Sequence, residues 1–255
     1  MTQQFILSLI SGIAIGGVAG YLGSLMMEKR MALVAGPLGH LTLPGVALAL
    51  IFGFDIFLGA FPFVILGIVV IWFLEIKTRL PMEALTAIIF ATGVAIALLF
   101  LPIDKAEEAL IGNITTVGLL GTLVTVILSL AVFITVRKIF SAMMLINVSE
   151  DLAKVEKVNV KKFNFIYLMA VAVVVALGVK LVGGLLTAAL VAIPAATARN
   201  LCRSLRSYAI LSFILGILAP IVGLIIYKFT DFPAGVLVIL TSALFFLISI
   251  VFRKK

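Results

Sequence analysis

Long apolar stretches fill most of this chain, and they constrain its fold more than any other feature. Eight of them approach the roughly 20 residues that a helix needs to cross a hydrocarbon core of about 30 Å. They occupy residues 5–26, 31–53, 56–75, 82–102, 114–136, 163–180, 208–228 and 234–252. A ninth stretch, 181–198, is shorter and is interrupted by Gly183, Gly184 and Pro194.

These stretches also predict the fold class. In lipid, only helices and closed barrels satisfy every backbone hydrogen-bonding group, and the stretches lack the two-residue alternation of barrel strands. The sequence therefore predicts an all-α protein, a polytopic transmembrane bundle with eight clear helices and a short, broken ninth segment. Residues 1–255 form a single transmembrane domain, because 64% of the chain is hydrophobic and no soluble domain interrupts it.

The distribution of charge predicts the orientation. Lysine and arginine are enriched in the cytoplasmic loops of membrane proteins. Placing the basic clusters in the cytoplasm leaves Lys105, Lys180 and Lys228, of 19 lysines and arginines, at the opposite face. The N-terminus of this multi-pass protein of the cytoplasmic membrane is then outside and the C-terminus inside. That arrangement requires an odd number of crossings, so 181–198 must return the chain to the cytoplasm.

Composition and motifs argue against several classes of function. The net charge of +8 favours anionic lipid and an acidic partner over nucleic acid, because no basic stripe with interleaved aromatic residues lies on a soluble element. No phosphate-binding loop, zinc-protease motif or Gly-x-Ser-x-Gly motif occurs in the sequence. The single cysteine, Cys202, forms neither an internal disulfide nor a thiolate cluster. We therefore expect no catalysis by this chain alone and no bound cofactor.

The longest hydrophilic stretch, 137–163, is predicted to lie in the cytoplasm. Ser149 precedes two acidic residues, which is typical of the start of a helix. Leu152, Val155 and Val158 would form an apolar face on this short amphipathic segment. Either the membrane surface or a partner protein would cover that face.

Three glycines in the first stretch recur every four residues, at Gly12, Gly16 and Gly20. This spacing removes side chains from one side of a helix and lets another helix approach closely. The pattern predicts a packing surface, and the sequence leaves open whether the neighbour belongs to this chain or to another.

His40 is the most informative polar residue within a predicted helix. It lies about ten residues beyond Lys29, or roughly 15 Å along a helix, which places it near the middle of the bilayer. An ionisable group at that depth usually faces a cavity or an ion path, and imidazole is a common ligand for zinc and similar metals. A neutral histidine hydrogen-bonded to a neighbouring helix is an equally good interpretation.

A second candidate site lies at 195–207. Pro194 is expected to end the preceding helix, and Arg199, Arg203 and Arg206 then recur at helical spacing. The pattern predicts a short amphipathic cytoplasmic helix whose arginines bind carboxylates of a partner. The alternative is a basic anchor that only fixes the orientation in the membrane.

Two segments carry a family resemblance. The segment around His40 reads RMALVAGPLGHLTLPGVALAL and resembles the second-helix signature of the permease subunits of zinc and manganese ABC importers. In that family a Gly-Asp-x-x-Ser-His-x-x-Leu-Pro-Gly-Val-Ala run is typical. Residues 176–216 resemble the family more strongly, above all in the Ile-Pro-Ala-Ala-Thr-Ala-Arg run. Weaker matches lie at 107–113, 149–165 and 231–240, and all the matching segments together appear in the family's order.

The resemblance implies a fold of the vitamin-B12-importer type, built as a homodimer or a paired permease. It also implies a cytoplasmic ATP-binding subunit that hydrolyses ATP and an extracytoplasmic metal-binding protein. The chain would be the permease subunit of an ATP-driven importer, with zinc, manganese or iron as the transported substrate. An ATP-independent secondary metal transporter or channel is the alternative, but it predicts more buried carboxylates than these helices carry.

The resemblance also assigns residues to the metal pathway. His40 would line the translocation path, supported by Gly36 and Gly39, which stand where the family has Asp and Ser. A pair of ligands on one helix face is thus reduced to a single imidazole. Glu83 aligns loosely with a family acid, and an interfacial carboxylate at a helix N-terminus is the other interpretation.

For 195–207, the resemblance implies the coupling helix that docks on the ATP-binding subunit. Pro194, Thr197 and Arg199 belong to the matching run, and Arg203 and Arg206 follow it. These five residues are therefore the predicted coupling residues.

The charge pattern leads to a first testable prediction. Labels at positions 29, 77, 137, 157 and 253 should react only from the cytoplasm, whereas a label at position 104 should react only from outside, because basic loops are retained inside. Labelling intact and permeabilised cells measures the side. Reaction of positions 104 and 157 from the same face would overturn the predicted orientation.

Overall fold

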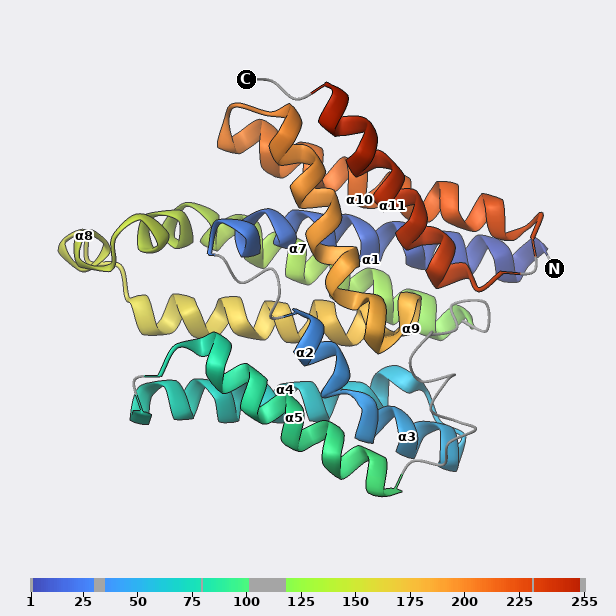
Figure 1. Ribbon diagram of the computed structural model, residues 1–255, viewed down its shortest axis with the longest axis horizontal. Helices are drawn as coiled ribbons and strands as arrows, with labels where there is room; N and C mark the ends of the chain where they lie inside the picture. Colours follow the sequence, from blue (N-terminus) through green and yellow to red (C-terminus); the bar gives the residue numbers. More distant parts are fainter. Residues whose placement is uncertain (1, 30–34, 79, 101–117, 231, 253–255) are drawn as a thin grey trace.

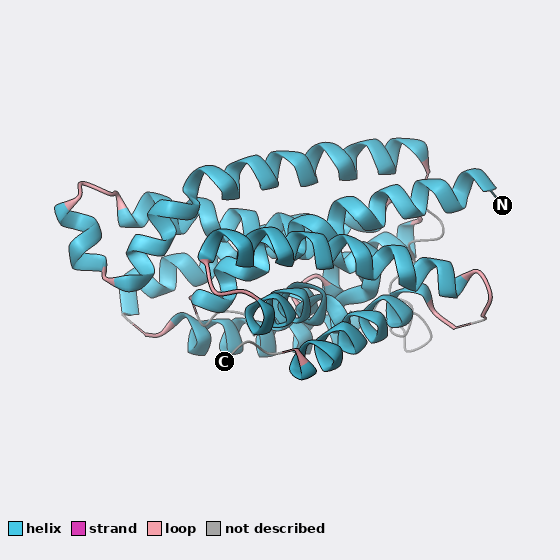
Figure 2. Cartoon of the chain, turned by 90° about the horizontal axis from the view of Figure 1, so that it is seen from above, coloured by secondary structure: helices cyan, strands magenta, loops and turns pink. Residues whose placement is uncertain are grey.

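The chain folds into a bundle of helices, which appear along their length in Figure 1 and from above in Figure 2. The computed structural model describes residues 2–29, 35–78, 80–100, 118–230 and 232–252, and within these ranges it contains no strand. The helices are α1 (Thr2–Glu28), α2 (Ala35–His40), α3 (Leu43–Phe52), α4 (Ile56–Thr78), α5 (Met82–Phe100), α7 (Leu119–Val148), α8 (Glu150–Val155), α9 (Val160–Leu201), α10 (Leu205–Tyr227) and α11 (Ala234–Val251). The predicted all-α class is confirmed.

Most of these helices have the dimensions of membrane spans. Six segments of the described residues are long and apolar enough to cross a bilayer, namely Gln3–Glu28, Ile56–Thr78, Leu119–Val148, Val160–Gly184, Leu205–Tyr227 and Ala234–Val251. Shorter apolar helices occupy Ala84–Ile96 and Leu186–Leu201. The chain is a multi-pass membrane protein, as predicted.

The predicted helix at 31–53 is wrong in one respect, because the described part of it consists of two short helices, α2 and α3. Between them, Leu41 and Thr42 form a turn in which the Leu41 N–H donates to Pro37 and the Thr42 N–H donates to Gly39. Pro44 stands in the first turn of α3, where its missing N–H leaves no hydrogen bond unmade. A proline there starts a new helix more easily than it continues an old one.

The segment 137–163 also differs from the prediction, because α7 continues through its first part to Val148. Ile139, Met143 and Ile146 recur at helical spacing and are buried in the core, so the helix gains burial by extending beyond Arg137. The predicted helix start at Ser149 is confirmed. Its hydroxyl accepts a hydrogen bond from the Leu152 N–H and caps α8.

The predicted break in 181–198 is confirmed at Gly183. This residue has φ 79° and ψ 169°, a conformation essentially limited to glycine, and α9 bends sharply there (Figure 1). The expectation that Pro194 ends a helix is wrong, since α9 continues past it to Leu201. Prolines are tolerated inside membrane helices where neighbouring helices and hydroxyl groups adjust to the lost backbone bond, and Pro194 is buried among such neighbours.

Because of this bend, both ends of α9 lie beside the C-terminal end of α1. The Lys29 Nζ donates to Asn164 near the start of α9 at 2.7 Å, and Arg199 near its end forms an ion pair with Glu28 at 2.7 Å. The segment 181–198 therefore returns the chain to the end from which α9 began, as predicted. Figure 1 shows the N-terminus at the right and α8 at the left, with the C-terminus at the upper left. Which end faces the cytoplasm stays a prediction.

The glycine face of α1 packs against α10 of the same chain, which answers the question that the sequence left open. A Cβ added to Gly16 would overlap the carbonyl oxygen of Gly216, and one added to Gly20 would overlap that of Ser212. Backbone therefore lies against backbone along this contact. The α1 helix contacts α7, α9 and α10, whereas α9 contacts α1, α2, α4, α7, α8, α10 and α11 and forms the centre of the bundle.

The close approach of α1 and α10 gives the second prediction. Gly16→Ala should lower the free energy of unfolding in detergent by about 1–3 kcal/mol, because the added methyl group forces two backbones apart. The measurement is thermal or denaturant unfolding of the purified protein. Gly118→Ala is the matched control, since a Cβ there meets nothing within 4 Å. Equal stability of the two variants would contradict the prediction.

Candidate functional site

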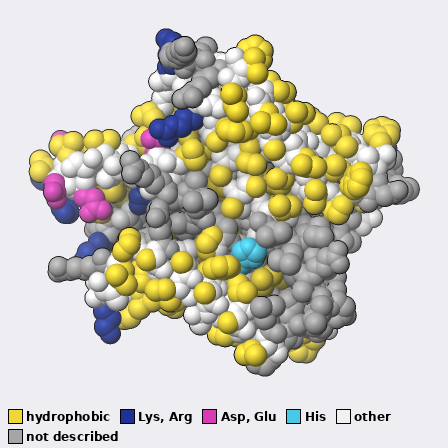
Figure 3. Space-filling model, in the orientation of Figure 1, with side chains coloured by type: hydrophobic (Ala, Val, Ile, Leu, Met, Phe, Trp, Pro, Cys, Tyr) yellow, Lys and Arg dark blue, Asp and Glu magenta, His cyan; other side chains and the backbone are white. Residues whose placement is uncertain are grey.

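His40 is the last residue of α2 and lies directly before the turn that separates α2 from α3. Its imidazole is partly buried, and its ring centroid lies 5.3 Å from that of Phe90 in α5, with the planes tilted by 48°. Figure 3 shows the histidine, in cyan, reaching the surface of the single chain. The predicted pathway residue therefore sits at interrupted helical backbone with one open side.

The turn at His40 rests on the bend of α9. A Cβ added to Gly39 would lie 2.5 Å from the carbonyl oxygen of Gly184, and one added to Gly184 would lie 3.0 Å from the carbonyl oxygen of Gly39. The two backbones are in direct contact, which leaves no room for a side chain at position 39. This contact is a physical reason for glycine at this position.

Two buried threonines stabilise the same contact. The Thr42 hydroxyl donates to the Gly39 carbonyl, and the Thr187 hydroxyl donates to the Gly183 carbonyl at 2.7 Å. Both threonines are fully buried. The Gly39 carbonyl accepts the Thr42 N–H as well, so the hydroxyl adds a second donor to a carbonyl next to the helix interruption. Sequence reasoning missed both residues, although each is a threonine within four residues of a glycine in a predicted helix.

Of the other predicted pathway residues, Gly36 lies near His40 in the sequence and Glu83 lies in a different helix. Gly36 lies one turn before His40 in α2. Glu83 is the second residue of α5, and the placement of its side chain lies outside the described residues. Within the part of the chain that the structure describes, no three His, Cys, Asp or Glu side chains lie close enough together to hold a metal ion.

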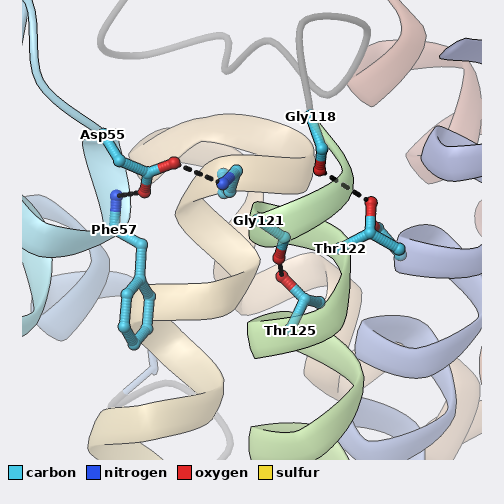
Figure 4. A network of polar contacts seen from close by, with 8 residues as sticks. Asp55, Phe57, Gly118, Gly121, Thr122 and Thr125 are labelled. Carbon is cyan, nitrogen blue, oxygen red and sulfur yellow. Dashed lines mark hydrogen bonds and ion pairs between the residues drawn. The ribbon is translucent and has the colours of Figure 1, made fainter.

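An ion pair that was not predicted lies in α9 just before the bend at Gly183. The Lys180 Nζ lies 2.7 Å from the Asp55 Oδ2, and the Asp55 Oδ1 accepts the Phe57 N–H at 2.9 Å (Figure 4). The Lys180 side chain is 9% exposed, whereas that of Asp55 is 41% exposed. Asp55 lies between the predicted stretches 31–53 and 56–75, in a loop at the face where the charge pattern places Lys180. That opposite-charge combination is the signal that could have predicted the pair. The pair ties α9 to the start of α4.

Polar side chains also line the buried face of α7 in Figure 4. The Thr125 hydroxyl donates to Gly121 at 2.7 Å, and the Thr122 hydroxyl donates to Gly118 at 3.2 Å. Ser11 of α1 lies 3.3 Å from the Thr122 hydroxyl. These hydroxyl groups satisfy one another and nearby carbonyls, so they contribute to helix packing rather than to an open site.

The predicted coupling helix at 195–207 is wrong as a separate element. The segment consists of the end of α9, a turn at 202–204 and the start of α10. Ser204 caps α10 by accepting the Ser207 N–H, and Asn200 donates to Ser249 of α11 at 3.0 Å. The helix extends to Leu201 because Ala195 and Ala198 are buried and continue its apolar face.

The five predicted coupling residues divide into two groups. Pro194 and Thr197 are buried, and the Thr197 hydroxyl donates to the Ile193 carbonyl within the helix, so neither lies on the surface of the chain. Arg203 and Arg206 are exposed. Arg199 is about half exposed and also pairs with Glu28.

A partly buried lysine supports the same end of the bundle. The Lys29 Nζ donates to Asn164 and lies 4.9 Å from the centre of the Tyr167 ring. Burial lowers the pKa of the Lys29 amine, and the carboxylates of Glu75 and Glu150 oppose that shift. Lys29 thereby joins the ends of α1 and α9 instead of serving as a free surface charge.

Comparison with known proteins gives consistent results over the whole chain. The sequence pattern of the ABC 3 transport family matches residues 1–253. The chain is 31% identical over 252 residues to the manganese import system permease protein ScaB of Streptococcus parasanguinis, covering 97% of this chain and 90% of that protein. It is 30% identical over 265 residues to the high-affinity zinc uptake system membrane protein ZnuB of Haemophilus influenzae, covering 97% of each.

A solved structure, PsaBC from Streptococcus pneumoniae in complex with Fab, contains a chain of similar fold. The TM-score is 0.82 at 29% sequence identity, and the match covers 98% of this chain and 95% of that one. The predicted transmembrane permease fold is confirmed by this likeness.

Proposed function

Because the chain belongs to the ABC 3 transport family, we propose that it is the permease subunit of an ATP-driven importer that moves a divalent transition metal across the cytoplasmic membrane. The match over residues 1–253 is the observation that carries this function. Relatives named for manganese import and for zinc uptake resemble the chain to nearly the same degree, so both metals are candidate substrates. Iron is the third candidate, because Fe²⁺ is also a divalent transition metal that imidazole binds.

The importer would contain partners that this chain lacks. A cytoplasmic ATP-binding subunit would hydrolyse ATP, an extracytoplasmic protein would deliver the metal, and a second permease would complete the path. The N-terminus would lie outside and the C-terminus in the cytoplasm. The support for this orientation is the charge pattern, together with the Lys29–Asn164 and Glu28–Arg199 contacts, which join basic segments at one end.

We assign the metal path to the surroundings of His40. In transporters, substrate sites often lie where helices are broken near the middle of the bilayer, and His40 stands at such a break. One neutral imidazole binds a divalent cation weakly, which suits a path from which the ion must leave. Gly36 and Gly39 add no side-chain ligand beside it.

The docking surface for the ATP-binding subunit would be the turn at 202–204 with its flanking arginines. Arg203 and Arg206 are exposed there, and guanidinium groups recognise carboxylates with two parallel hydrogen bonds. Pro194 and Thr197 would act indirectly, by shaping the buried helix that leads to the turn. Arg199 would contribute less, because part of its charge is already engaged by Glu28.

Replacement of His40 tests the metal path. In proteoliposomes that contain the chain, its ATP-binding subunit and its metal-delivering protein, His40→Ala should reduce uptake of manganese or zinc about 10-fold or more, because the ligand is lost. Thr135→Ala, at a non-buried position on α7, is the control for handling and assembly. Gly36→Asp should instead raise the affinity for the metal, because it places a carboxylate one turn from the imidazole.

Normal uptake by His40→Ala, with no gain of affinity in Gly36→Asp, would assign His40 to packing. Uptake that proceeds without ATP would favour a secondary transporter or channel over the importer.

Replacement of the arginines tests the docking surface. Arg203→Ala with Arg206→Ala should weaken association with the ATP-binding subunit, since each charged contact is worth about 1–3 kcal/mol when desolvated. Arg199→Ala alone should have the smaller effect, because Glu28 already satisfies part of that guanidinium. Co-purification from detergent measures the association. Undiminished association of the double variant would leave these arginines as membrane anchors.

A further inference from the structure

Two interrupted helices meet at the backbone of Gly39 and Gly184. One interruption is the turn after His40, and the other is the bend of α9 at Gly183. The positions of the added Cβ atoms, 2.5 Å and 3.0 Å from the opposing carbonyl oxygens, show that neither backbone has room to shift towards the other. Any movement of α9 at Gly184 therefore acts directly on the residue next to His40.

The first half of α9 is fixed at both ends. The Lys29–Asn164 hydrogen bond fixes its start, and the Asp55–Lys180 ion pair fixes its end, directly before the bend. These contacts join it to α1 and to the start of α4. Beyond Gly183, the second half has contacts of its own near the turn, the Glu28–Arg199 ion pair and the Asn200–Ser249 hydrogen bond, and these join it to α1 and α11.

The second half of α9 is one continuous helix from Gly184 to Leu201, with no further break in its backbone angles. Midway, Gly23 of α1 lies against the carbonyl of Val191, so closely that a Cβ on Gly23 would overlap it. At a rise of 1.5 Å per residue, this contact lies about 10 Å from Gly184 and about 15 Å from Leu201. A tilt about Gly23 would move the two ends in opposite directions by comparable amounts.

We propose that Gly39 and Gly184 are positioning residues for His40, and that their contact links the imidazole through the helix 184–201 to the exposed turn at 202–204. This inference rests on the proposed function, because it takes that turn as the docking surface for the ATP-binding subunit. In this proposal the helix 184–201 tilts about its contact with Gly23. A displacement of the turn then changes the position of His40 without any contact between the ATP-binding subunit and the metal path.

Substitution of the two glycines tests the linkage through the ratio of metal taken up to ATP hydrolysed. In the reconstituted importer, Gly39→Ala should lower manganese or zinc uptake about 10- to 100-fold, because a displacement near 1 Å at a working group has effects of this size. ATP hydrolysis should change far less, because the docking surface is untouched. Gly184→Ala should show a weaker form of the same uncoupling, since its methyl group has more room. Gly118→Ala is the matched control.

A second measurement follows His40 without transport. The chain has one histidine, so the rate at which diethylpyrocarbonate modifies imidazole in the purified, tag-free protein reports on His40 alone. Gly39→Ala and Gly184→Ala should change this rate, and Gly118→Ala should leave it as in the wild type. Binding of the ATP-binding subunit to the wild type should also change the rate, measured by mass spectrometry on the His40 peptide so that histidines of the subunit do not contribute. This response should be lost in Gly39→Ala.

The outcomes separate the two proposals. Absence of ATP-driven metal uptake by the wild type would overturn the proposed function. Wild-type uptake, with an unchanged ratio and an unchanged modification rate in folded Gly39→Ala and Gly184→Ala, would overturn the linkage. If Gly39→Ala does not fold, the result for Gly184→Ala decides.

Discussion

Direct contact between helix backbones is the interaction on which the rest of this structure depends. Lipid is as apolar as leucine, so helices in a membrane gain little from hydrophobic burial and associate through close packing and hydrogen bonds. Glycine makes that approach possible at Gly16 and Gly216 between α1 and α10, and at Gly39 and Gly184 between α2 and α9. The first contact holds α1 against α10, and the second fixes the surroundings of His40.

Polar groups complete these contacts at the places where the helices are broken. Thr42 and Thr187 donate to the carbonyls of Gly39 and Gly183, which are buried beside the two helix interruptions. The Asp55–Lys180 pair joins α9 to the start of α4 just before the bend, and the partly exposed Asp55 carboxylate compensates the charge of the buried lysine. The irregular backbone near His40 is therefore stabilised within the protein, where Gly39, Leu41 and Thr42 are buried.

The sequence predicted the fold class, the bend at Gly183 and the helix start at Ser149, because each rests on a local property. Apolar length, the special backbone freedom of glycine and side-chain capping act over a few residues. It failed at Pro194 and at 139–148, where burial against other helices outweighs the local signal. His40 was found from its depth and its residue type. The contact of Gly39 with Gly184 joins residues far apart in the chain, and no local pattern indicates it.

The doubling back of α9 has a consequence for how copies of this chain can be joined. With both ends of α9 at one end of the bundle, the chain finishes at the end opposite to its start, and Figures 1 and 2 show the two termini well apart along the long axis. With the N-terminus outside and the C-terminus in the cytoplasm, as we propose, two copies standing side by side in the same orientation would have the C-terminus of one and the N-terminus of the other on different faces of the membrane. A short peptide is insufficient to fuse them into a single polypeptide. The fusion needs an added membrane-crossing helix between the copies.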